Sequence, residues 1–529
     1  MKNIAIIISI LSFFNITYAQ VPVIQWQNTI GGYQSDVISS IKETLDGGYI
    51  LSGYSNSSIG RDKSSFYIGT FDFWVVKINS IGLIMWQKSF GGTLFNDNPI
   101  VRQNLDGTYI VAGTSNSGIS GNKTVNTNGG DDVWILKLDN SGNILWQKSI
   151  GGSNYDALSS IEIESNGNIL MAVTSISSIS GDKTEINYGL YDYWVLELNN
   201  QCEILWQKTI GGSANDFVNS ICKTFDDGYI ISGYSYSQIS GNKTIDTYGE
   251  SDYWIIKLDQ NKNIIWQKSY GGDSTENNTS LYPTPQGDFV VGGSSNSLIS
   301  GNKTVNNNGN FDYWVLKLDF AGTIIWQKSF GGSLSDDFAS IDRTQEGNFI
   351  LGGNSLSSIS GDKTELNRGV DDIWIVKIDE NGTILWDKTI GGNEHDYLKK
   401  DNIISTSDNG LIIGANSLSG ISGEKTEIAT GQDYWIIKLS PDNLSNNTLD
   451  SSTFSIYPNP TSGIFNIKFN STFENYTITI RNYLGQIVKQ ENISTTNIYT
   501  NSIETQSGFY FIELKNKSNQ KITFKIIKI

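Results

Sequence analysis

Carboxylates are the residues of this chain whose types and spacing could serve chemistry. One set stands two residues before a tryptophan in each of seven repeats, and a second set follows a Gly-Gly pair. The first set is Asp72, Asp132, Asp192, Asp252, Asp312, Asp372 and Asp433, and the second is Asp36, Asp156, Asp216, Asp336 and Asp396. Oxygen ligands suit calcium, but the dense Asp-x-Asp-x-Asp-Gly order of a calcium loop is missing. We expect these side chains to cap loop backbone, and calcium stays open as an alternative.

Other catalytic chemistry finds little support. His395 is the single histidine, and Cys202 and Cys222 are the two cysteines, too few for a zinc site or a disulfide framework. A recurring Gly-Asn/Asp-Lys-Thr segment, as at 181–184, lacks the upstream glycine and the strand-to-helix setting of a phosphate loop, so we expect a solvated loop. No nucleophile, base and orienting group are recognisable together. The sequence therefore predicts no catalytic, cofactor-binding or metal-binding residue.

Two sets of tryptophans define the repeat that must position any site. The first begins each Trp-Gln-Lys-x-x-Gly-Gly stretch at intervals of sixty residues, at Trp26, Trp86, Trp146, Trp206, Trp266, Trp326 and Trp386. The second follows the carboxylates in the setting Asp-x-Trp, at Trp74, Trp134, Trp194, Trp254, Trp314, Trp374 and Trp435. Near-identical copies at strand positions indicate structural docking between repeats rather than ligand platforms.

Each repeat predicts four short strands, which the third copy places at 156–164, 169–174, 193–198 and 204–209. Strands that are apolar on both faces are typical of stacked sheets. The chain begins with a fourth strand at 21–28 and ends its last repeat with a third strand at 434–439, and pairing the two would close a ring. The prediction is an all-β, seven-bladed β-propeller, followed by a small β-sandwich.

Composition and charge limit the classes of partner and the cellular location expected for this protein. The formal net charge of −17 disfavours nucleic acid. Residues 1–19 have the short apolar run and small-residue end of a secretory signal peptide, and no later stretch is apolar enough to span a bilayer. The expected divisions are 1–19 signal peptide, 20–440 propeller, 441–453 linker and 454–529 C-terminal domain. Strands of that domain are expected at 454–457, 463–469, 476–482, 486–490, 508–515 and 521–527.

Four segments of the C-terminal domain carry a resemblance. They are Tyr457-Pro458-Asn459-Pro460-Thr461-Ser462-Gly463, then a segment around Gly485, then Ser507-Gly508-Phe509-Tyr510, and an ending around Lys525. The domain resembles the type A C-terminal sorting domain of the type IX secretion system, although Tyr483 and Gln486 depart from the usual middle motif. The resemblance implies export through the outer-membrane secretion machinery to the cell surface or the medium. The propeller is similar to uncharacterised secreted repeat proteins that carry the same domain.

The function is expected in the loops that differ between repeats. The loops between second and third strands share one face of the ring with the Gly-Gly loops, and their variable residues are Asn126, Asn128, Asn187, Tyr188, Thr247, Tyr248, Asn307 and Asn308. We expect a non-enzymatic binding or adhesion module with a glycan or a surface protein as partner. The alternatives are a hydrolase or lyase acting on polysaccharide at this face, and a structural extracellular component.

Overall fold

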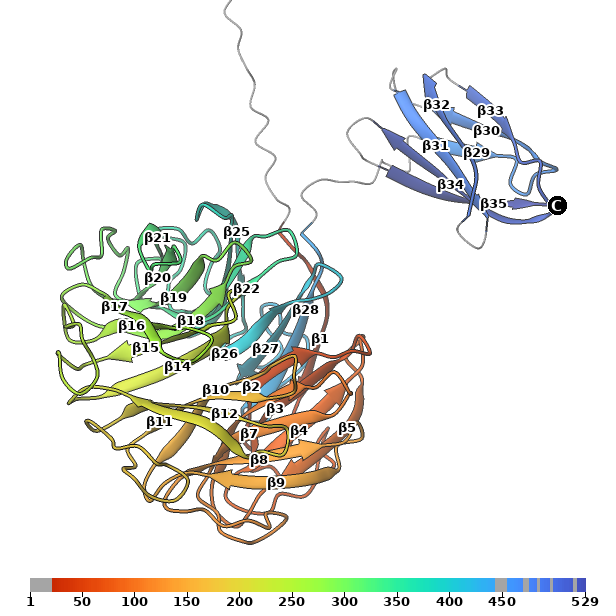
Figure 1. Cartoon of the computed structure of the whole chain (residues 1–529). Helices are drawn as coiled ribbons and strands as arrows, with labels where there is room; N and C mark the ends of the chain where they lie inside the picture. Colours follow the sequence, from red (N-terminus) through yellow and green to blue (C-terminus); the bar gives the residue numbers. More distant parts are fainter. Residues whose placement is uncertain (1–20, 443–453, 470–474, 483–485, 495–497, 517–520) are drawn as a thin grey trace, which may run out of the picture. The chain divides into compact units, whose positions relative to one another are not determined.

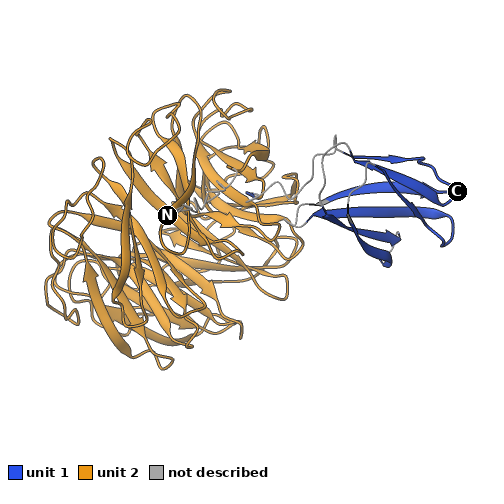
Figure 2. Cartoon of the chain, turned by 90° about the horizontal axis from the view of Figure 1, so that it is seen from above, with its two compact units in different colours: residues 1–20, 442–529 blue, residues 21–441 orange. Residues whose placement is uncertain are grey.

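The computed structural model describes residues 21–442, 454–469, 475–482, 486–494, 498–516 and 521–529. It divides into two compact units, Val21–Pro441 in one and residues 1–20 with Asp442–Ile529 in the other (Figure 2). The predicted signal peptide, most of the predicted linker and Gly485 lie outside the described residues. The signal peptide and the exact domain boundaries stay predictions.

The larger unit consists of strands β1–β28 and, among its described residues, contains no helix. The strands of the first four sheets are β2(Asp36–Glu43), β3(Tyr49–Ser55), β4(Asp72–Ile78), β5(Ile84–Phe90), β6(Asn96–Gln103), β7(Tyr109–Ser115), β8(Asp132–Leu138), β9(Ile144–Ile150), β10(Asp156–Ile163), β11(Ile169–Ser175), β12(Asp192–Leu198), β13(Ile204–Ile210), β14(Asp216–Lys223), β15(Tyr229–Ser235), β16(Asp252–Leu258) and β17(Ile264–Tyr270). The remaining strands are β18(Glu276–Pro283), β19(Phe289–Ser295), β20(Asp312–Leu318), β21(Ile324–Phe330), β22(Asp336–Arg343), β23(Phe349–Ser355), β24(Asp372–Ile378), β25(Ile384–Ile390), β26(Asp396–Ser405), β27(Leu411–Ser417), β28(Asp433–Leu439) and β1(Ile24–Ile30).

These strands form seven four-stranded antiparallel sheets, the blades of a propeller. Six sheets take four consecutive strands each, and the seventh has the order β1-β28-β27-β26. In that sheet Thr29 pairs with Trp435 and Ile30 with Tyr434, so the N-terminal strand completes the last blade. The first strands of the blades lie nearest the centre of the ring in Figure 1, and the fourth strands lie at its rim. The predicted seven-bladed propeller and its mode of closure are confirmed.

The seventh blade departs from the others in its innermost strand. β26 has ten residues where the other first strands have eight, and its pairing with β27 is interrupted between Leu398 and Ile403. The two-residue shift that the sequence shows before Leu411 therefore arises earlier, as a bulge in the strand that faces the channel.

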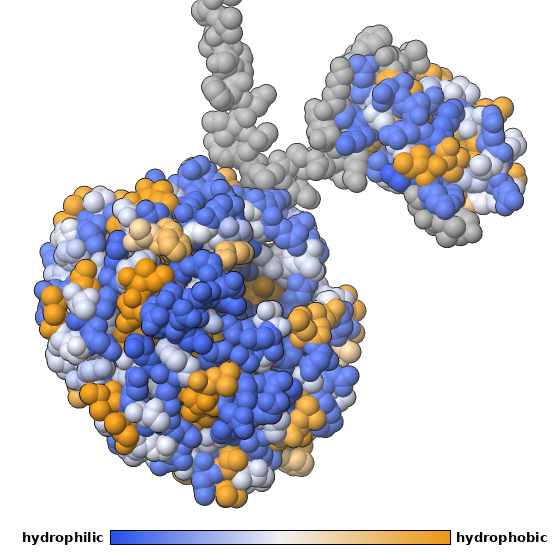
Figure 3. All heavy atoms as spheres, in the orientation of Figure 1, coloured by the Kyte–Doolittle hydropathy of each residue, from blue (hydrophilic) through white to orange (hydrophobic). Residues whose placement is uncertain are grey.

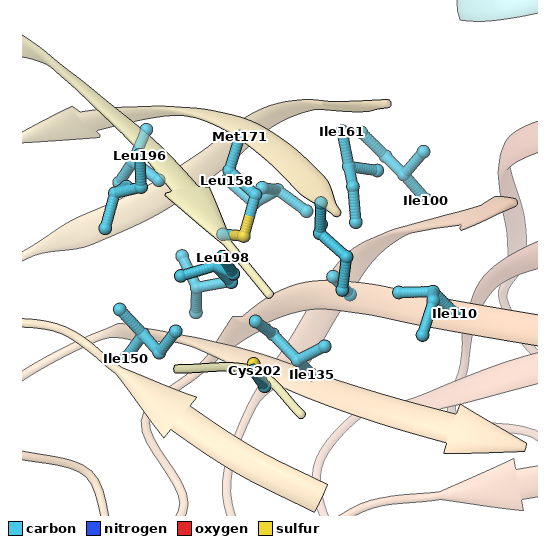
Figure 4. Close-up of a cluster of buried hydrophobic side chains, with 14 of the residues drawn as sticks. Ile100, Ile110, Ile135, Ile150, Leu158, Ile161, Met171, Leu196, Leu198 and Cys202 are labelled. Atoms are coloured by element: carbon cyan, nitrogen blue, oxygen red, sulfur yellow. The ribbon is translucent and has the colours of Figure 1, made fainter. Parts of the chain in front are cut away.

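The core lies between blades rather than within one blade. One buried cluster joins Ile110 and Ile135 of the second blade to Leu158, Met171 and Leu196 of the third (Figure 4). The seven tryptophans of the Asp-x-Trp set are fully buried, and five of them lie against an aromatic ring of the preceding blade's third strand, as Trp254 does against Tyr193 with ring centroids 5.0 Å apart. Burial of such a ring stabilises by about 2–3 kcal/mol.

The Trp-Gln-Lys-x-x-Gly-Gly stretch serves this packing. The indole of Trp86 donates to the carbonyl of Asn140 in the next blade at 3.2 Å and faces Gly142, where an added Cβ would lie 2.8 Å from the ring. The glutamine that follows the tryptophan in this stretch contacts two parts of its own blade. Gln147 accepts from the buried Trp134 indole at 3.2 Å and donates to the Asn122 carbonyl in the long loop. Glycine at position 142, with φ of 79°, is therefore required by both backbone conformation and close approach.

The smaller unit has two sheets with the orders β29-β30-β33 and β32-β31-β34-β35. Its strands are β29(Phe454–Tyr457), β30(Ile464–Phe469), β31(Asn475–Asn482), β32(Ile487–Ser494), β33(Ile498–Ser502), β34(Gly508–Asn516) and β35(Lys521–Lys528). The predicted β-sandwich is confirmed. β33 was not predicted, because Thr500, Asn501 and Ser502 are polar and show no apolar alternation; it is an edge strand paired with β30.

Ring closure gives a direct stability test. A chain that starts at Gly31 loses β1, so the third strand of the seventh blade loses its pairing and Trp435 loses its contact with Gln27 at 2.9 Å. We expect the free energy of unfolding of the propeller to fall by about 3 kcal/mol or more. Urea unfolding followed by tryptophan fluorescence measures this, with a chain starting at Val21 as the control. An unchanged midpoint would contradict closure by β1.

Candidate functional site

The residues at the mouth of the central channel break the sevenfold repeat. On the face that carries the long loops, the second residue of the inner strand is Val37, Asp97, Ala157, Phe217, Asn277, Asp337 or Tyr397 in successive blades. The residue just before the Asp-x-Trp carboxylate varies as widely, from Phe71 to Asp131, Tyr191, Ser251, Phe311, Asp371 and Gln432. The scaffold positions beside them repeat almost unchanged, so this mouth is where the chain differs from one blade to the next.

A cavity of about 600 Å³ opens at this mouth beside the second, third and fourth blades. Five aromatic side chains line it, namely Phe95, Tyr155, Tyr191, Phe217 and Tyr234. The Tyr191 and Phe217 ring centroids are 5.0 Å apart, and those of Phe217 and Tyr234 are 5.2 Å apart, so the rings form a connected arc. Phe95 is exposed and the other four are partly buried, which leaves aromatic surface for a ligand.

Polar groups complete the lining of this aromatic cavity. Asn116 and Asn219 supply amides, and Asp97 and Asp131 supply carboxylates. Burial raises the pKa of both carboxyls, and the charge of Lys399 partly opposes this for Asp97. Burial, followed by the charges of Asp97 and Asp131, raises the pKa of Tyr155 to about 12. The cavity combines aromatic faces with hydrogen-bonding groups, the arrangement that fits a small polar ligand.

A second cavity of about 580 Å³ continues down the channel and shares Asn98, Leu158, Ser159 and Asn219 with the first. The bulge of β26 crosses it. Lys400 donates to the carbonyls of Ser159 and Asn219, on the opposite side of the ring. The channel is thus blocked by residues that no other blade possesses.

Below Lys400, an ion network fixes the bulge. Arg102 is buried and donates to Asp401 at 2.9 Å and to Glu162 at 3.2 Å. Burial raises the pKa of Asp401, but Lys42, Arg102 and Lys400 outweigh it and hold that pKa below its ordinary value. Since Arg102 pairs with both Asp401 and Glu162, we interpret this network as a floor to the channel rather than a reactive group.

Lys399 projects from the same bulge with a different environment. Its ammonium donates to the Asn98 amide oxygen at 2.9 Å and to the Tyr54 hydroxyl at 3.1 Å, and it lies 4.7 Å from the Tyr54 ring centroid. Burial lowers the pKa of Lys399 to about 8, against the opposing charge of Asp97. Lys399 lines the deeper cavity and not the aromatic one.

His395 also lies at this face, in the loop that enters the seventh blade. Its Nδ1 is in hydrogen-bond contact with a carboxylate oxygen of Asp371, from the sixth blade, and the side chain is exposed. A carboxylate that orients an imidazole leaves the other ring nitrogen available for proton transfer. Sequence spacing alone does not join these residues, because Asp371 stands in a column that varies between blades and only Asp131 of the second blade matches it.

The long-loop residues predicted to recognise a ligand are distributed between structural and exposed roles. The Asn128 amide donates to the Gly151 carbonyl at 3.0 Å and to Asp182 at 2.7 Å, and Asn308 makes the equivalent contacts. Tyr188 and Tyr248 are exposed. None of these residues lines the aromatic cavity.

The expectation that the Gly-Asn/Asp-Lys-Thr segments are solvated is wrong for their lysines. A tight turn at the loop tip, as between Ser180 and Lys183, folds the lysine stem inward. The ammonium of Lys183 lies 5.6 Å from the Trp194 ring centroid and donates to the Ser175 hydroxyl at 2.8 Å. All seven equivalents are buried over a tryptophan, namely Lys63, Lys123, Lys183, Lys243, Lys303, Lys363 and Lys425. Burial lowers the pKa of each to about 8.

The two carboxylate sets meet at the blade boundaries. Asp156 accepts from the Gly152 amide at 2.7 Å and from the Ser177 hydroxyl at 2.8 Å, and Asp132 accepts from the Asn128 amide, so both sets cap loops. Burial raises the pKa of Asp132, Asp252 and Asp312 to about 7, and the negative charge of a neighbouring carboxylate adds to this rise. Within the described residues, no three His, Cys, Asp or Glu side chains gather as a metal site would need. Both cysteines are free.

The residues predicted as a sorting signal lie largely at one end of the smaller unit. Asn459, in the turn of Tyr457, Pro458 and Pro460, donates to the Lys525 carbonyl at 2.8 Å and accepts from the Ile527 amide at 2.9 Å. Gly463 precedes β30, and Gly508 begins β34. Tyr510 is buried in the core, with its hydroxyl 2.8 Å from that of Thr505. The Lys525 ammonium lies 4.1 Å from the Phe509 ring centroid.

The C-terminal segment matches a known family. Residues 455–529 match the secretion system C-terminal sorting domain. This part of the chain is a sorting domain, and the protein is exported to the cell surface or the extracellular space. Among the described residues, no helix has the length and apolar character needed to cross a membrane.

The propeller has distant structural neighbours. A protein of unknown function from Dyadobacter fermentans DSM 18053 is 11% identical, with a TM-score of 0.41 over 79% of this chain and 99% of that one. An ulvan lyase, a polysaccharide lyase, is 10% identical, with a TM-score of 0.40 over 77% and 97%. A variant of the Synechocystis apocarotenoid oxygenase is 14% identical, with a TM-score of 0.39 over 76% and 88%. Comparison with curated proteins gives no match.

The buried carboxyls and lysines predict an unusual dependence of stability on pH. Carboxyls with raised pKa keep protons in the native state that the unfolded chain has released, so stability falls as pH rises from 5 to 7.5. Lysines with lowered pKa release protons in the native state first, so stability rises again from pH 8 towards 9.5. Thermal unfolding at constant ionic strength should show the minimum, and Asp132→Asn should make the acid limb shallower. A midpoint that rises steadily from pH 5 to 7.5 would contradict this account.

Proposed function

We propose that this protein is an exported carbohydrate-binding and adhesion module whose site is the aromatic cavity beside the second, third and fourth blades. The observation that carries the proposal is the arc of partly buried Tyr155, Tyr191, Phe217 and Tyr234 around a cavity that also presents amides and carboxylates. The C–H faces of a pyranose pack on aromatic rings, and its hydroxyls need hydrogen-bond partners placed around them.

The rest of the ring face supports one such site rather than seven. The positions of the aromatic arc hold aromatic residues in some other blades, as at Tyr54, Phe71 and Tyr397, and mostly small or polar residues elsewhere, so the combination of rings differs from blade to blade while the scaffold repeats. The side of the propeller seen in Figure 3 is mostly hydrophilic with separate apolar patches, so that side offers no broad apolar surface for a partner. Export by the sorting domain brings this face to where extracellular glycans are met.

A glycan array probed with the full chain tests the proposal. We expect a narrow set of oligosaccharides to bind, and Tyr191→Ala to weaken the best of them about tenfold, since one lost stacking contact is worth about 1.4 kcal/mol. Titration calorimetry gives the ratio of dissociation constants.

Tyr248→Ala is the matched control, because it removes an exposed tyrosine of the same face that does not line the cavity. Silence across the array, or equal losses for the two variants, would refute a carbohydrate site in this cavity.

The second candidate is an enzyme that acts on polysaccharide, and the contact between His395 and Asp371 favours it. The pair lies at the channel mouth, on the side of the sixth and seventh blades. Two residues after His395, the Tyr397 hydroxyl accepts a hydrogen bond from the Gln432 side-chain amide. An oriented imidazole could exchange a proton with a bound sugar.

Release of new sugar ends from polysaccharides by the full chain would support the enzyme. His395→Asn should then lower the rate about 100-fold or more, since general acid–base catalysis contributes at least that much. Asp371→Asn should lower it less and alter its pH profile, because Asp371 only orients the ring. Binding without turnover by the unaltered chain would leave the binding module as the function.

A further inference from the structure

The charge of the aromatic cavity specifies its ligand further, on the basis of the carbohydrate-binding function proposed above. Sixteen residues line the cavity, and none of them is Lys, Arg or His. Two of them are carboxylates, Asp97 and Asp131. Within the described residues neither carboxylate forms a salt bridge.

The two carboxylates line the same cavity as Tyr155 and Tyr191, whose rings lie edge-on at 5.9 Å between centroids. Consistent with this, the charges of Asp97 and Asp131 both contribute to the raised pKa of Tyr155. Like charges at a partly buried site repel each other, and a cation placed between them would relieve that repulsion. The charge of Lys399 acts on Asp97, but Lys399 forms no salt bridge with it, donates instead to Tyr54 and Asn98, and does not line the aromatic cavity.

We propose that the aromatic cavity binds a saccharide that carries a free, protonated amino group. The ammonium would lie between Asp97 and Asp131 with its hydrogens directed at the carboxylates, and the sugar ring would pack on Tyr191 and Phe217. Charge-assisted hydrogen bonds and the faces of tyrosine rings both attract an ammonium. An acidic saccharide would bring a further negative charge beside Asp97 and Asp131, and no lining residue carries a positive charge to offset it.

The test compares two oligosaccharides of equal length, one of glucosamine and one of N-acetylglucosamine, because acetylation removes the charge and leaves the ring. Titration calorimetry of the full chain at pH 6 should give at least tenfold tighter binding of the amino form. Asp131→Asn should reduce that preference about tenfold, and Asp97→Asn should act in the same direction.

Glu394→Gln is the control for the general negative charge of the protein, since Glu394 is an exposed carboxylate of the same face outside the cavity. It should leave the preference unchanged. Equal binding of both oligosaccharides would overturn the inference and keep the carbohydrate site. Binding of neither form, with silence for neutral sugars, would overturn both. An equal loss in Glu394→Gln and Asp131→Asn would also overturn the inference, because the attraction would then be general.

Discussion

The structure depends on the burial of one tryptophan per blade against the blade before it. A four-stranded sheet with two apolar faces needs a neighbour on each side, and a closed ring is the arrangement that gives one to every sheet. Trp254 against Tyr193 and Trp374 against Tyr313 show the contact, which recurs around the ring. The pairing of β1 with β28 makes the ring continuous, so a strand at the start of the chain completes the blade at its end.

This symmetric packing places polar groups under unusual constraint. Each long loop returns a lysine to the buried tryptophan of its own blade, and the carboxylates beside it cap the loops that cross between blades. The lysine and the carboxylates are all withdrawn from water, so burial disfavours the charged form of each, and the opposite charges nearby offset this only in part. The repeated motif therefore stabilises the packing of the blades, and we expect the residues that do not repeat to determine specificity. They gather at the mouth of the channel, where a floor formed by Lys400, Asp401 and Arg102 closes the passage beneath them.

The fold could be predicted because the repeat is regular and the two ends are complementary. Trp146 and Trp194 mark strands by their spacing alone, and a lone fourth strand at Trp26 implies closure. The cavity could not be predicted in the same way. Tyr155, Tyr191 and Phe217 are separated in the sequence and are brought together only by the ring. Arg102 and Asp401 are 299 residues apart, and their contact depends on a bulge that the sequence shows only as a shift in register.

Burial of the loop lysines was missed for a physical reason, since Gly-Asp-Lys-Thr at 181–184 is polar throughout and only the tip turn directs Lys183 inward. The positions at the channel mouth vary most between aligned repeats. The long-loop residues Asn128 and Asn308 vary as well, but they make structural contacts with the Gly-Gly loops. Variation between otherwise identical blades is thus a better guide to the site than loop length.

A crystal structure of the full chain with its best-bound oligosaccharide tests the central claim most directly. The account predicts one sugar per chain, in the cavity of the second, third and fourth blades, with a pyranose packed on Tyr191 and Phe217. Sugar at seven equivalent positions around the ring, or at one site outside that cavity, would contradict it.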